Sequence, residues 1–189
     1  QTSVPMSCKS DAPYNYGPAS GRDQLVFGSA RPGAVKQRCF SSEDKVTELE
    51  VQEWGQFMQK QGVTRVVGLL SESELATYKR SPIEVLREMG FAALNVDIAK
   101  DGPQAGFHAV EAELKDAELH AHKVVVHCWG GGGRTGKVLA AWLCTRYGLT
   151  EEEAAAAVEA TAKECKSSRR AEVVGVRELL PSSVQTCES

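Results

Sequence analysis

The sequence predicts an α/β fold, with a central, mainly parallel sheet of about four to five strands flanked by helices. Three observations predict it. Short apolar runs rich in valine alternate along the chain with longer segments whose apolar residues have helical spacing. Glycine or proline punctuates the boundaries of many of these segments, and the chain contains no internal repeat. Strands that alternate with helices are typical of domains built on a parallel sheet.

The first 23 residues are expected to form an extended or loosely packed polar arm. They are rich in Pro, Gly, Ser and Tyr and show no regular apolar spacing. The strand and helix signals begin at Gln24, so we expect one domain over residues 24–189. A chain of this length can bury roughly 70% of its unfolded surface, which is enough for a core without a disulfide scaffold.

The first elements of the domain are a strand, a helix and a second strand. A short strand is expected at residues 25–28 and a helix over residues 46–61, which Gly62 ends. The helix has one mostly apolar face, formed by Val46, Leu49, Trp54, Phe57 and Met58. Residues 63–70 read VTRVVGLL, an apolar run suited to a strand that is buried on both faces.

The middle of the chain repeats this alternation. Ser81 and Glu84 form a capping box around Pro82, and the helix that they open ends at Gly90. A strand follows at residues 91–96 and a helix at residues 107–120. Residues 123–127, KVVVH, then form a short buried strand.

Three helices complete the predicted domain. One begins after Gly136 and ends at Gly148, a residue suited to the left-handed end of a helix. Thr150 and Glu153 form a capping box for a helix that extends to about residue 163. The last helix is expected over residues 169–180 and stops before Pro181.

Charge and hydropathy exclude two classes of function. Lys and Arg number 22 and Asp and Glu 25, so the net charge of −3 argues against a nucleic-acid protein that works through bulk positive charge. No apolar run approaches the ~20 residues of a membrane-spanning helix. We therefore expect neither nucleic acid nor a membrane span among the partners, and no oligomeric state is predicted.

The six cysteines are scattered and form no CxxC pair, so we expect no zinc site, no other metal and no cofactor. Scattered cysteines in a chain large enough to build its own core are typical of free thiols in a reducing compartment. The expected location is therefore the cytoplasm.

One segment, residues 124–137 with the sequence VVVHCWGGGGRTGK, carries the chemistry. A buried strand ends in Cys128, four glycines follow, and Arg134 comes just before the next helix. Glycines allow the backbone to curl so that its N–H groups form a nest for an anion, and the helix N-terminus adds partial positive charge. Arg134 can donate two hydrogen bonds to phosphate oxygens. These groups favour a thiolate at Cys128, placed beneath a bound phosphate as a nucleophile.

A nucleotide-binding loop is the rival interpretation of the same segment. Gly131, Gly136 and Lys137 match the first seven positions of the pattern GxxxxGK[ST]. The eighth position is Val138, so the hydroxyl that would hold Mg²⁺ is missing. The rival also leaves unexplained why the strand ends in a cysteine.

The segment His127-Cys128-x5-Arg134-Thr135-Gly136 resembles the HCxxGxxR[ST]G signature of cysteine-based protein tyrosine phosphatases, and Gly131 meets the middle glycine. The short domain and the upstream residues 27–30, FGSA, are similar to the small dual-specificity subgroup. The resemblance covers roughly residues 24–180 and is strongest at residues 123–147. It implies a mainly parallel sheet flanked by helices, as in the dual-specificity phosphatases.

The resemblance also implies a two-step reaction and a role for each site residue. Cys128 attacks phosphorus to form a cysteinyl phosphate, which water then hydrolyses. His127 organises the loop and tunes the thiolate, and Thr135 donates a hydrogen bond to the cysteine sulfur as it leaves. The phosphate would be bound by Arg134 and by the backbone amides of the loop, which are those of Trp129, Gly130, Gly131, Gly132, Gly133 and Arg134.

The family also places an aspartate, as general acid, on a loop roughly thirty residues before the cysteine. Asp97 and Asp101 are the candidates, 31 and 27 residues before Cys128. Spacing favours Asp97, but Asp101 lies in the turn-like sequence KDGPQ just before a predicted helix. We expect Asp101 to be the acid and keep Asp97 as the alternative.

The loop contains no lysine at its variable positions, whereas phosphoinositide phosphatases of this family often place basic residues there. The expected substrate is therefore phosphotyrosine in a protein, with phosphoserine and phosphothreonine also accepted. Another phosphomonoester, either a phosphoinositide or a small metabolite, stays open. The alternative function is a catalytically weak module on the same fold that binds phosphorylated partners.

Overall fold

The computed structural model of the chain describes residues 12–34 and 44–181. Its centre is a five-stranded sheet with the strand order β1-β2-β5-β3-β4. The strands are β1 (Gly17–Pro18), β2 (Val26–Ala30), β5 (Lys123–Cys128), β3 (Val63–Gly68) and β4 (Ala92–Asn95). Only β1 runs antiparallel to its neighbour, and the other three pairs are parallel. The predicted α/β fold class with a mainly parallel sheet is confirmed.

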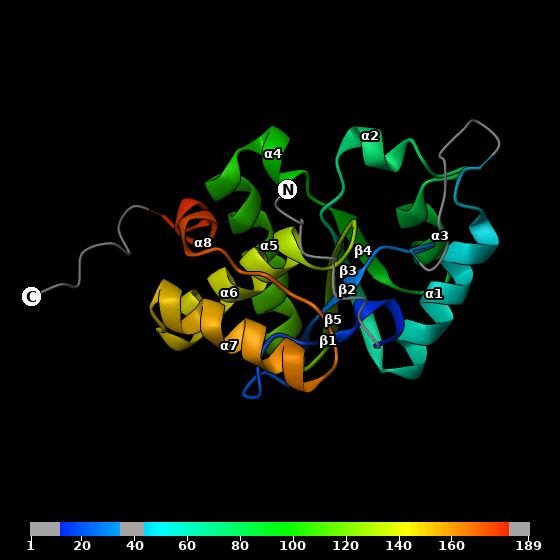
Figure 1. Ribbon diagram of the computed structural model, residues 1–189. Coiled ribbons are helices and arrows are strands. Elements are labelled where there is room, and N and C mark those ends of the chain that lie inside the picture. The colour runs from blue at the N-terminus through cyan, green and yellow to red at the C-terminus, as the bar shows by residue number, and fades with distance from the viewer. Residues whose placement is uncertain (1–11, 35–43, 182–189) are drawn as a thin grey trace, which may run out of the picture.

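Helices cover both faces of the sheet, so that it lies between two helical layers (Figure 1). One layer contains α1 (Glu48–Lys60) and α3 (Pro82–Glu88). The other layer contains α5 (Pro103–Leu119), α6 (Gly133–Tyr147), α7 (Glu151–Glu164) and α8 (Val173–Leu179). Three short elements lie outside these layers, and they are η1 (Pro13–Asn15), α2 (Glu72–Leu75) and α4 (Ile98–Asp101).

The central strand β5 shows why the chain needs two apolar layers. Val124 and Val126 pack into the cluster beneath α5 to α8, whereas Val125 packs into the cluster beneath α1 and α3. All three side chains are completely buried, because successive residues of a strand point to opposite faces. The continuous valine run is therefore the pattern of a strand that is covered on both sides.

Most helix boundaries agree with the capping signals of the sequence. Thr150 and Glu153 form the predicted reciprocal capping box, and the Ser81 side chain accepts from the Glu84 N–H. Gly148 ends α6 with a φ of 67° in the left-handed region, as predicted. The start of α6 differs, since the helix begins at Gly133 and already includes Arg134.

The described part of the predicted N-terminal arm, residues 12–23, is folded against the domain. β1 pairs with β2 at the edge of the sheet, and Ala19 is completely buried. The Asp23 carboxylate accepts hydrogen bonds from the Leu25 and Val26 N–H groups and from the Trp142 indole. The expectation of a loosely packed arm is wrong for these residues, because polar side chains here satisfy backbone groups of the core rather than solvent.

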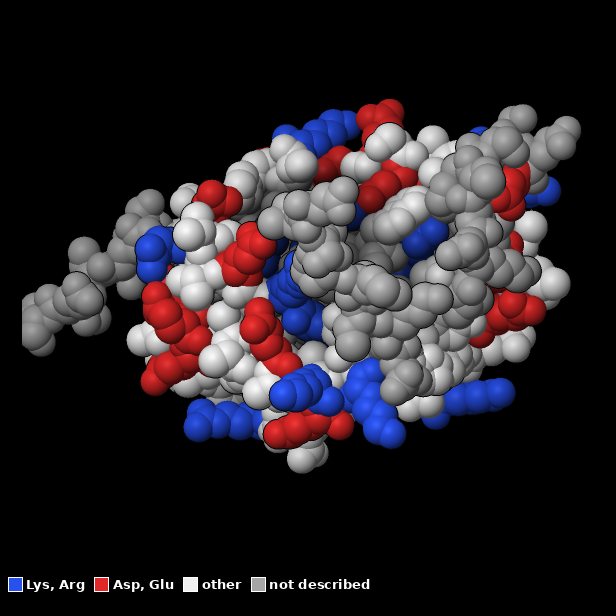
Figure 2. Space-filling view, viewed as in Figure 1, with Lys and Arg blue, Asp and Glu red and all other residues white. Residues whose placement is uncertain are grey.

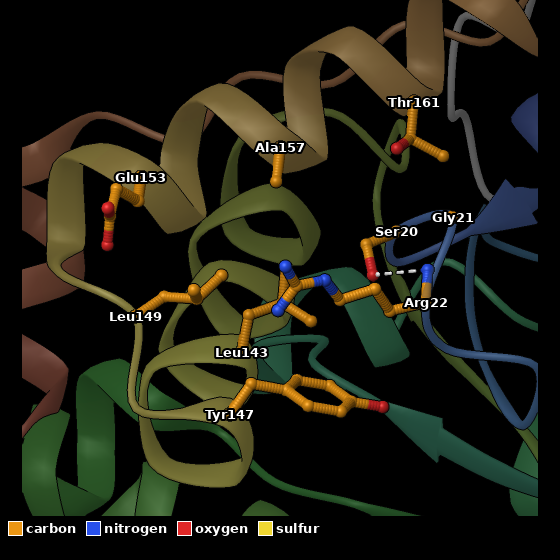
Figure 3. A pocket seen from close by; sticks show the side chains of 9 residues that line it. All are labelled: Ser20, Gly21, Arg22, Leu143, Tyr147, Leu149, Glu153, Ala157 and Thr161. Carbon is orange, nitrogen blue, oxygen red and sulfur yellow. Dashed lines mark hydrogen bonds between the residues drawn. The ribbon is translucent and has the colours of Figure 1, made fainter.

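A cavity of about 390 Å³ lies between this N-terminal segment and the helices α6 and α7 (Figure 3). The Arg22 side chain extends over Leu143 in this cavity, and Tyr147 lies beside it. On the face shown in Figure 2, basic and acidic side chains are interspersed rather than gathered into one patch. None of the helices in residues 12–34 and 44–181 is long and apolar enough to cross a bilayer.

Candidate active site

The candidate site lies where the parallel strands end. β2, β3, β4 and β5 run in the same direction, so the residues that follow them meet at one edge of the sheet. Crevices at the carboxyl ends of such strands are the usual binding sites of open α/β sheets. The segment 124–137, singled out in the sequence, crosses this edge, because β5 ends at Cys128 and α6 begins at Gly133.

Cys128 is the last residue of β5 and is buried, with 3% of its surface exposed. It pairs with Ala30 of the neighbouring strand β2. The nucleophile candidate is thus held by two strands of the sheet, and the residues that follow it form a short loop that leads into α6.

Two glycines are required for the path of this loop. Gly131 has a φ of 74°, and a Cβ there would lie 2.4 Å from the carbonyl carbon of Ser29. A Cβ on Gly136 would lie 2.1 Å from the carbonyl oxygen of Arg170. Both positions belong to the sequence signature, and in both the backbone approaches another segment more closely than any side chain permits.

Trp129 and the remaining loop glycines differ in their exposure and in their position relative to α6. The Trp129 ring is half-buried, and the Arg31 guanidinium lies over it at 3.4 Å from the ring centroid. Gly130 is exposed, Gly132 is the N-cap of α6, and Gly133 is the first residue of that helix. The backbone amides of the loop are therefore continuous with those of the N-terminus of α6, an arrangement that favours the binding of an anion.

Arg134 lies in the first turn of α6 and is held by two acceptors. Its Nη1 donates to the Leu69 carbonyl oxygen at 2.7 Å and to Glu74 Oε2 at 2.7 Å, while its Nη2 donates to Glu74 Oε1 at 2.5 Å. Glu74 thus binds the end of the guanidinium that is formed by Nη1 and Nη2. The Nε hydrogen and the second Nη2 hydrogen lie along the other edge, where they form a fork that matches phosphate oxygens.

Glu74 is a site residue that the sequence analysis missed. It belongs to α2, where its carboxylate also accepts from the Ser71 N–H in a capping box. Burial raises the pKa of Glu74, but hydrogen bonds from Arg134 and Ser71 outweigh it and hold this pKa below its usual value. The S-x-x-E spacing of Ser71 and Glu74 could have predicted the start of α2, but not its contact with Arg134.

Positive charge near Cys128 comes from two arginines. The hydrogen bonds to Glu74 raise the pKa of Arg134, and the charges of Cys128 and Asp97 raise it further. Arg169 is the second arginine, and it was not predicted. Burial lowers its pKa to about 10, although the charge of Cys128 opposes this. Both guanidinium groups therefore place positive charge near Cys128.

His127, immediately before the nucleophile, is completely buried and lies edge-on to Trp54. Within the described residues neither of its ring nitrogens has a hydrogen-bond partner. Burial lowers the pKa of His127 to about 4, and the nearby charges of Arg31 and Arg134 act in the same direction. The imidazole is therefore neutral at pH 7, so the positive charge at the site belongs to the arginines.

His127 is expected to make the fold sensitive to acid. Unfolded histidine binds its proton at a pKa near 6.5, whereas the folded group binds it near 4, so protonation favours the unfolded chain as the pH falls. At about 1.4 kcal/mol per pKa unit, the free energy of unfolding should drop by about 3 kcal/mol between these values. Urea unfolding of the wild type and of His127→Gln at several pH values measures this.

The exposed His108 provides the control. His108→Gln should keep the wild-type pH dependence of the unfolding free energy, and His127→Gln should flatten it between about pH 6.5 and pH 4. An unchanged slope in His127→Gln would show that the buried imidazole is not the acid-labile group.

Thr135 follows Arg134 in the first turn of α6 and is completely buried. In the described part of the chain its Oγ1 has no hydrogen-bond partner. A buried hydroxyl without a partner destabilises a protein by about 1–3 kcal/mol. The hydroxyl is thus available to a group that the reaction brings to the site.

The two candidate acids occupy opposite ends of α4. Asp97 is its N-cap, and the carboxylate accepts from the Lys100 N–H at 3.3 Å. Asp101 is its last residue and is exposed. The charge of Asp97 reaches Arg134 and contributes to the raised pKa of that arginine. The turn predicted around Asp101 is part of a helical turn, so the residue does not lie in the open loop that favoured it.

The family model of the DSP-PTPase phosphatase domain of Swiss Army Knife proteins, PTP-SAK, matches residues 38–189. None of the curated protein sequences compared with the chain matches it. The matched range contains the candidate site described above except for Ser29, Ala30 and Arg31.

Solved structures of phosphatases have the same fold. The active form of Tk-PTP is 20% identical with a TM-score of 0.61, and the match covers 91% of this chain and 97% of that chain. Kinase associated phosphatase with its catalytic cysteine replaced by serine is 18% identical with a TM-score of 0.62, covering 84% of this chain and 88% of that chain. PTPMT1 in complex with PI(5)P is 18% identical with a TM-score of 0.62, covering 90% of this chain and 96% of that chain.

Proposed function

The chain belongs to the PTP-SAK family of DSP-PTPase phosphatase domains, and on that premise we propose that it hydrolyses phosphoric monoesters with the Cys128 thiolate as nucleophile. The observation that carries the proposal is the position of Cys128 at the end of β5, directly before a glycine loop that leads to Arg134 in the first turn of α6. The arrangement supports a thiolate by means of two nearby guanidinium groups and a helix N-terminus.

In the first step the Cys128 sulfur forms a bond to phosphorus as the bond to the leaving oxygen breaks, and a carboxylic acid gives that oxygen a proton. In the second step water attacks the cysteinyl phosphate and the same carboxylate takes a proton from the water, so that inorganic phosphate and the thiolate are released. Arg134 and the loop amides stabilise the equatorial oxygens in both steps. The Thr135 hydroxyl donates to the departing sulfur in the second step.

For the acid we propose Asp97, in place of the Asp101 favoured by the sequence. Two observations support this choice. Asp97 lies two residues after the end of β4, at the carboxyl edge of the sheet, and its charge raises the pKa of Arg134. Asp101 is separated from it by the length of α4 and is exposed.

Asp97→Asn is expected to lower kcat by about 10²–10⁴-fold for substrates with poor leaving groups. The loss should be much smaller for activated esters such as p-nitrophenyl phosphate, since a stable phenolate departs without a proton. Steady-state kinetics on a series of aryl phosphates of rising leaving-group pKa measures this dependence. The basic limb of the pH–rate profile should also flatten.

Asp101→Asn is the matched control, because it makes the same change four residues away on the same short helix. It should retain the wild-type dependence on the leaving group. The reverse result, with the dependence in Asp101→Asn alone, would restore the assignment favoured by the sequence. If neither variant shows it, the acid is neither of these residues.

We propose phosphotyrosine in proteins as the preferred substrate, with phosphoserine and phosphothreonine also accepted. The charge at the site supports a single dianionic phosphate: the loop carries no lysine, and Glu74 offsets part of the charge of Arg134. PTPMT1 was solved with PI(5)P, so a phosphoinositide is the alternative that the test includes.

The proposal is tested first by hydrolysis of p-nitrophenyl phosphate, with orthovanadate as the expected inhibitor. A panel of phosphotyrosine, phosphoserine and phosphothreonine peptides and vesicles containing PI(5)P then ranks the substrates by kcat/KM. Faster release of phosphate from the vesicles than from any peptide would contradict the substrate choice. Phosphopeptide binding without turnover would instead favour the catalytically weak binding module.

A further inference from the structure

The loop carbonyls between Cys128 and Arg134 are bound by donors from outside the loop. The Trp129 carbonyl oxygen accepts from the Arg31 N–H at 3.3 Å and from Arg31 Nη1 at 3.2 Å. The Gly132 carbonyl oxygen accepts from the Gly136 N–H at 2.9 Å and from the Arg170 N–H at 3.4 Å. The Gly130 carbonyl oxygen accepts from Asn15 Nδ2 at 3.0 Å.

These contacts matter because a peptide unit is planar and trans, so that its C=O and its N–H point in opposite directions. None of the described peptide bonds is cis. A donor that draws the Gly130 carbonyl outward therefore turns the Gly131 N–H towards the inside of the loop. The inside of the loop is where the nest of N–H groups must face to bind phosphate.

Asn15 is built for this contact. Its Nδ2 also donates to the Ser168 carbonyl oxygen at 2.8 Å, and its Oδ1 accepts from the Ser168 N–H at 2.7 Å. Both amide hydrogens and the oxygen are thus used, and the amide cannot be flipped without opposing two carbonyl oxygens. A single buried side chain joins the phosphate loop to the segment that precedes α8.

The backbone of Asn15 is held as firmly as its side chain. Its φ of 54° lies in the left-handed region, which asparagine tolerates better than most residues. Its carbonyl oxygen accepts from Nη2 of the buried Arg169, which also donates to the Gly17 and Gly28 carbonyl oxygens. The N-terminal segment is therefore tied to β2 and to the loop before α8 at the same point.

We propose that Asn15 is a positioning residue of the phosphate loop, which orients the Gly130–Gly131 peptide so that its N–H faces the bound phosphate. The inference rests on the proposed function only in taking a phosphate as the ligand of the loop. Asn15 takes no part in the chemistry, and its effect on the reaction passes through the loop amide.

The test compares Asn15→Gly and Asn15→Asp with the wild type. Glycine keeps the positive φ but removes the three side-chain hydrogen bonds. Aspartate keeps the size and the acceptor for Ser168, but sets a carboxylate oxygen against two carbonyl oxygens. Both variants should raise the inhibition constant for orthovanadate by about 10- to 100-fold and lower kcat/KM for p-nitrophenyl phosphate by a similar factor. Vanadate binding is also measured directly by calorimetry.

Asp23→Asn is the control for a general loss of stability. The buried Asp23 carboxylate fixes the same N-terminal segment to the Val26 N–H and the Trp142 indole, and these contacts do not involve the loop. The control variant should lower Tm by at least as much as Asn15→Gly while leaving vanadate binding unchanged. Equal losses of vanadate binding in Asp23→Asn and Asn15→Gly at equal Tm would overturn the inference.

The two proposals fail in different ways. A wild-type protein that binds vanadate without turning over any ester refutes the proposed function, and weaker vanadate binding by Asn15→Gly still supports the positioning role. A wild-type protein with turnover that Asn15→Gly and Asn15→Asp both retain supports the function and refutes the positioning role. A variant that fails to fold is identified by its loss of a thermal transition. If Asn15→Gly fails to fold, Asn15→Asp, which keeps the acceptor for the Ser168 N–H, decides the question.

Discussion

Replacement of Cys128 by serine is expected to abolish turnover and to leave phosphate binding intact. A serine hydroxyl at this place is not ionised at neutral pH, so the attack on phosphorus is lost and the rate should fall by on the order of 10⁴–10⁶-fold. The proposed binding groups are the loop amides and Arg134, and none of them depends on the sulfur atom. Turnover of p-nitrophenyl phosphate and calorimetry with inorganic phosphate measure the two effects.

Cys144→Ser makes the same change at a second buried cysteine, within α6. Burial raises the pKa of the Cys144 thiol to about 12, so this thiol is not a nucleophile at neutral pH. The control variant should keep its turnover per folded molecule. Residual activity of Cys128→Ser near that of the control would mean that another group attacks phosphorus.

Arg134→Lys is expected to lower kcat by about 10²–10³-fold, the usual loss when a preorganised donor to the transition state is removed. The planar guanidinium binds the Leu69 carbonyl and both oxygens of Glu74. In the proposed complex its remaining edge binds the phosphate at the same time. An ammonium group has no such plane, and it would be drawn to the Glu74 carboxylate and away from the phosphate. Steady-state kinetics with p-nitrophenyl phosphate measures the loss.

Arg80→Lys is the matched control. Arg80 also pairs with glutamates, Glu48 and Glu88, and the side chains of these partners are 44% and 58% exposed. Surface ion pairs of this kind contribute little to stability, so the variant should retain wild-type kinetics. If Arg134→Lys also kept its kcat, the arginine would serve the fold of the loop and not the transition state.

The loop that joins Cys128 to Arg134 could be predicted because its neighbours in space are also its neighbours in sequence. The strand, the glycines and the helix start are contiguous, and each has a local signal. The sheet could be predicted for the same reason, since a valine run such as residues 124–126 shows burial on both faces without reference to the rest of the fold.

Glu74, Arg169 and Asn15 could not be predicted in this way. They come from three separate parts of the chain: Asn15 binds the loop, Glu74 binds Arg134, and the charge of Cys128 acts on Arg169. Only the packing of the fold brings them together. The choice between Asp101 and Asp97 as general acid also depends on the packing and not on local sequence. A turn-like sequence around Asp101 does not reveal that α4 forms there. Nor does it reveal that the charge of Asp97, at the other end of α4, raises the pKa of Arg134. The sequence of residues 12–23 predicts a loosely packed arm because it has few apolar residues. Sequence alone does not show that its polar side chains bind backbone groups of the domain.

The double role of Glu74 couples a local folding equilibrium to the orientation of Arg134. Its carboxylate caps α2 and binds the guanidinium in the same position, so the two contacts are made and lost together. α2 has four residues and none of them is buried, which places it among the least protected elements of the described chain. If this turn frays, Arg134 loses Glu74 as an acceptor and keeps the Leu69 carbonyl. The ordered turn is therefore the state in which the guanidinium is held by both acceptors.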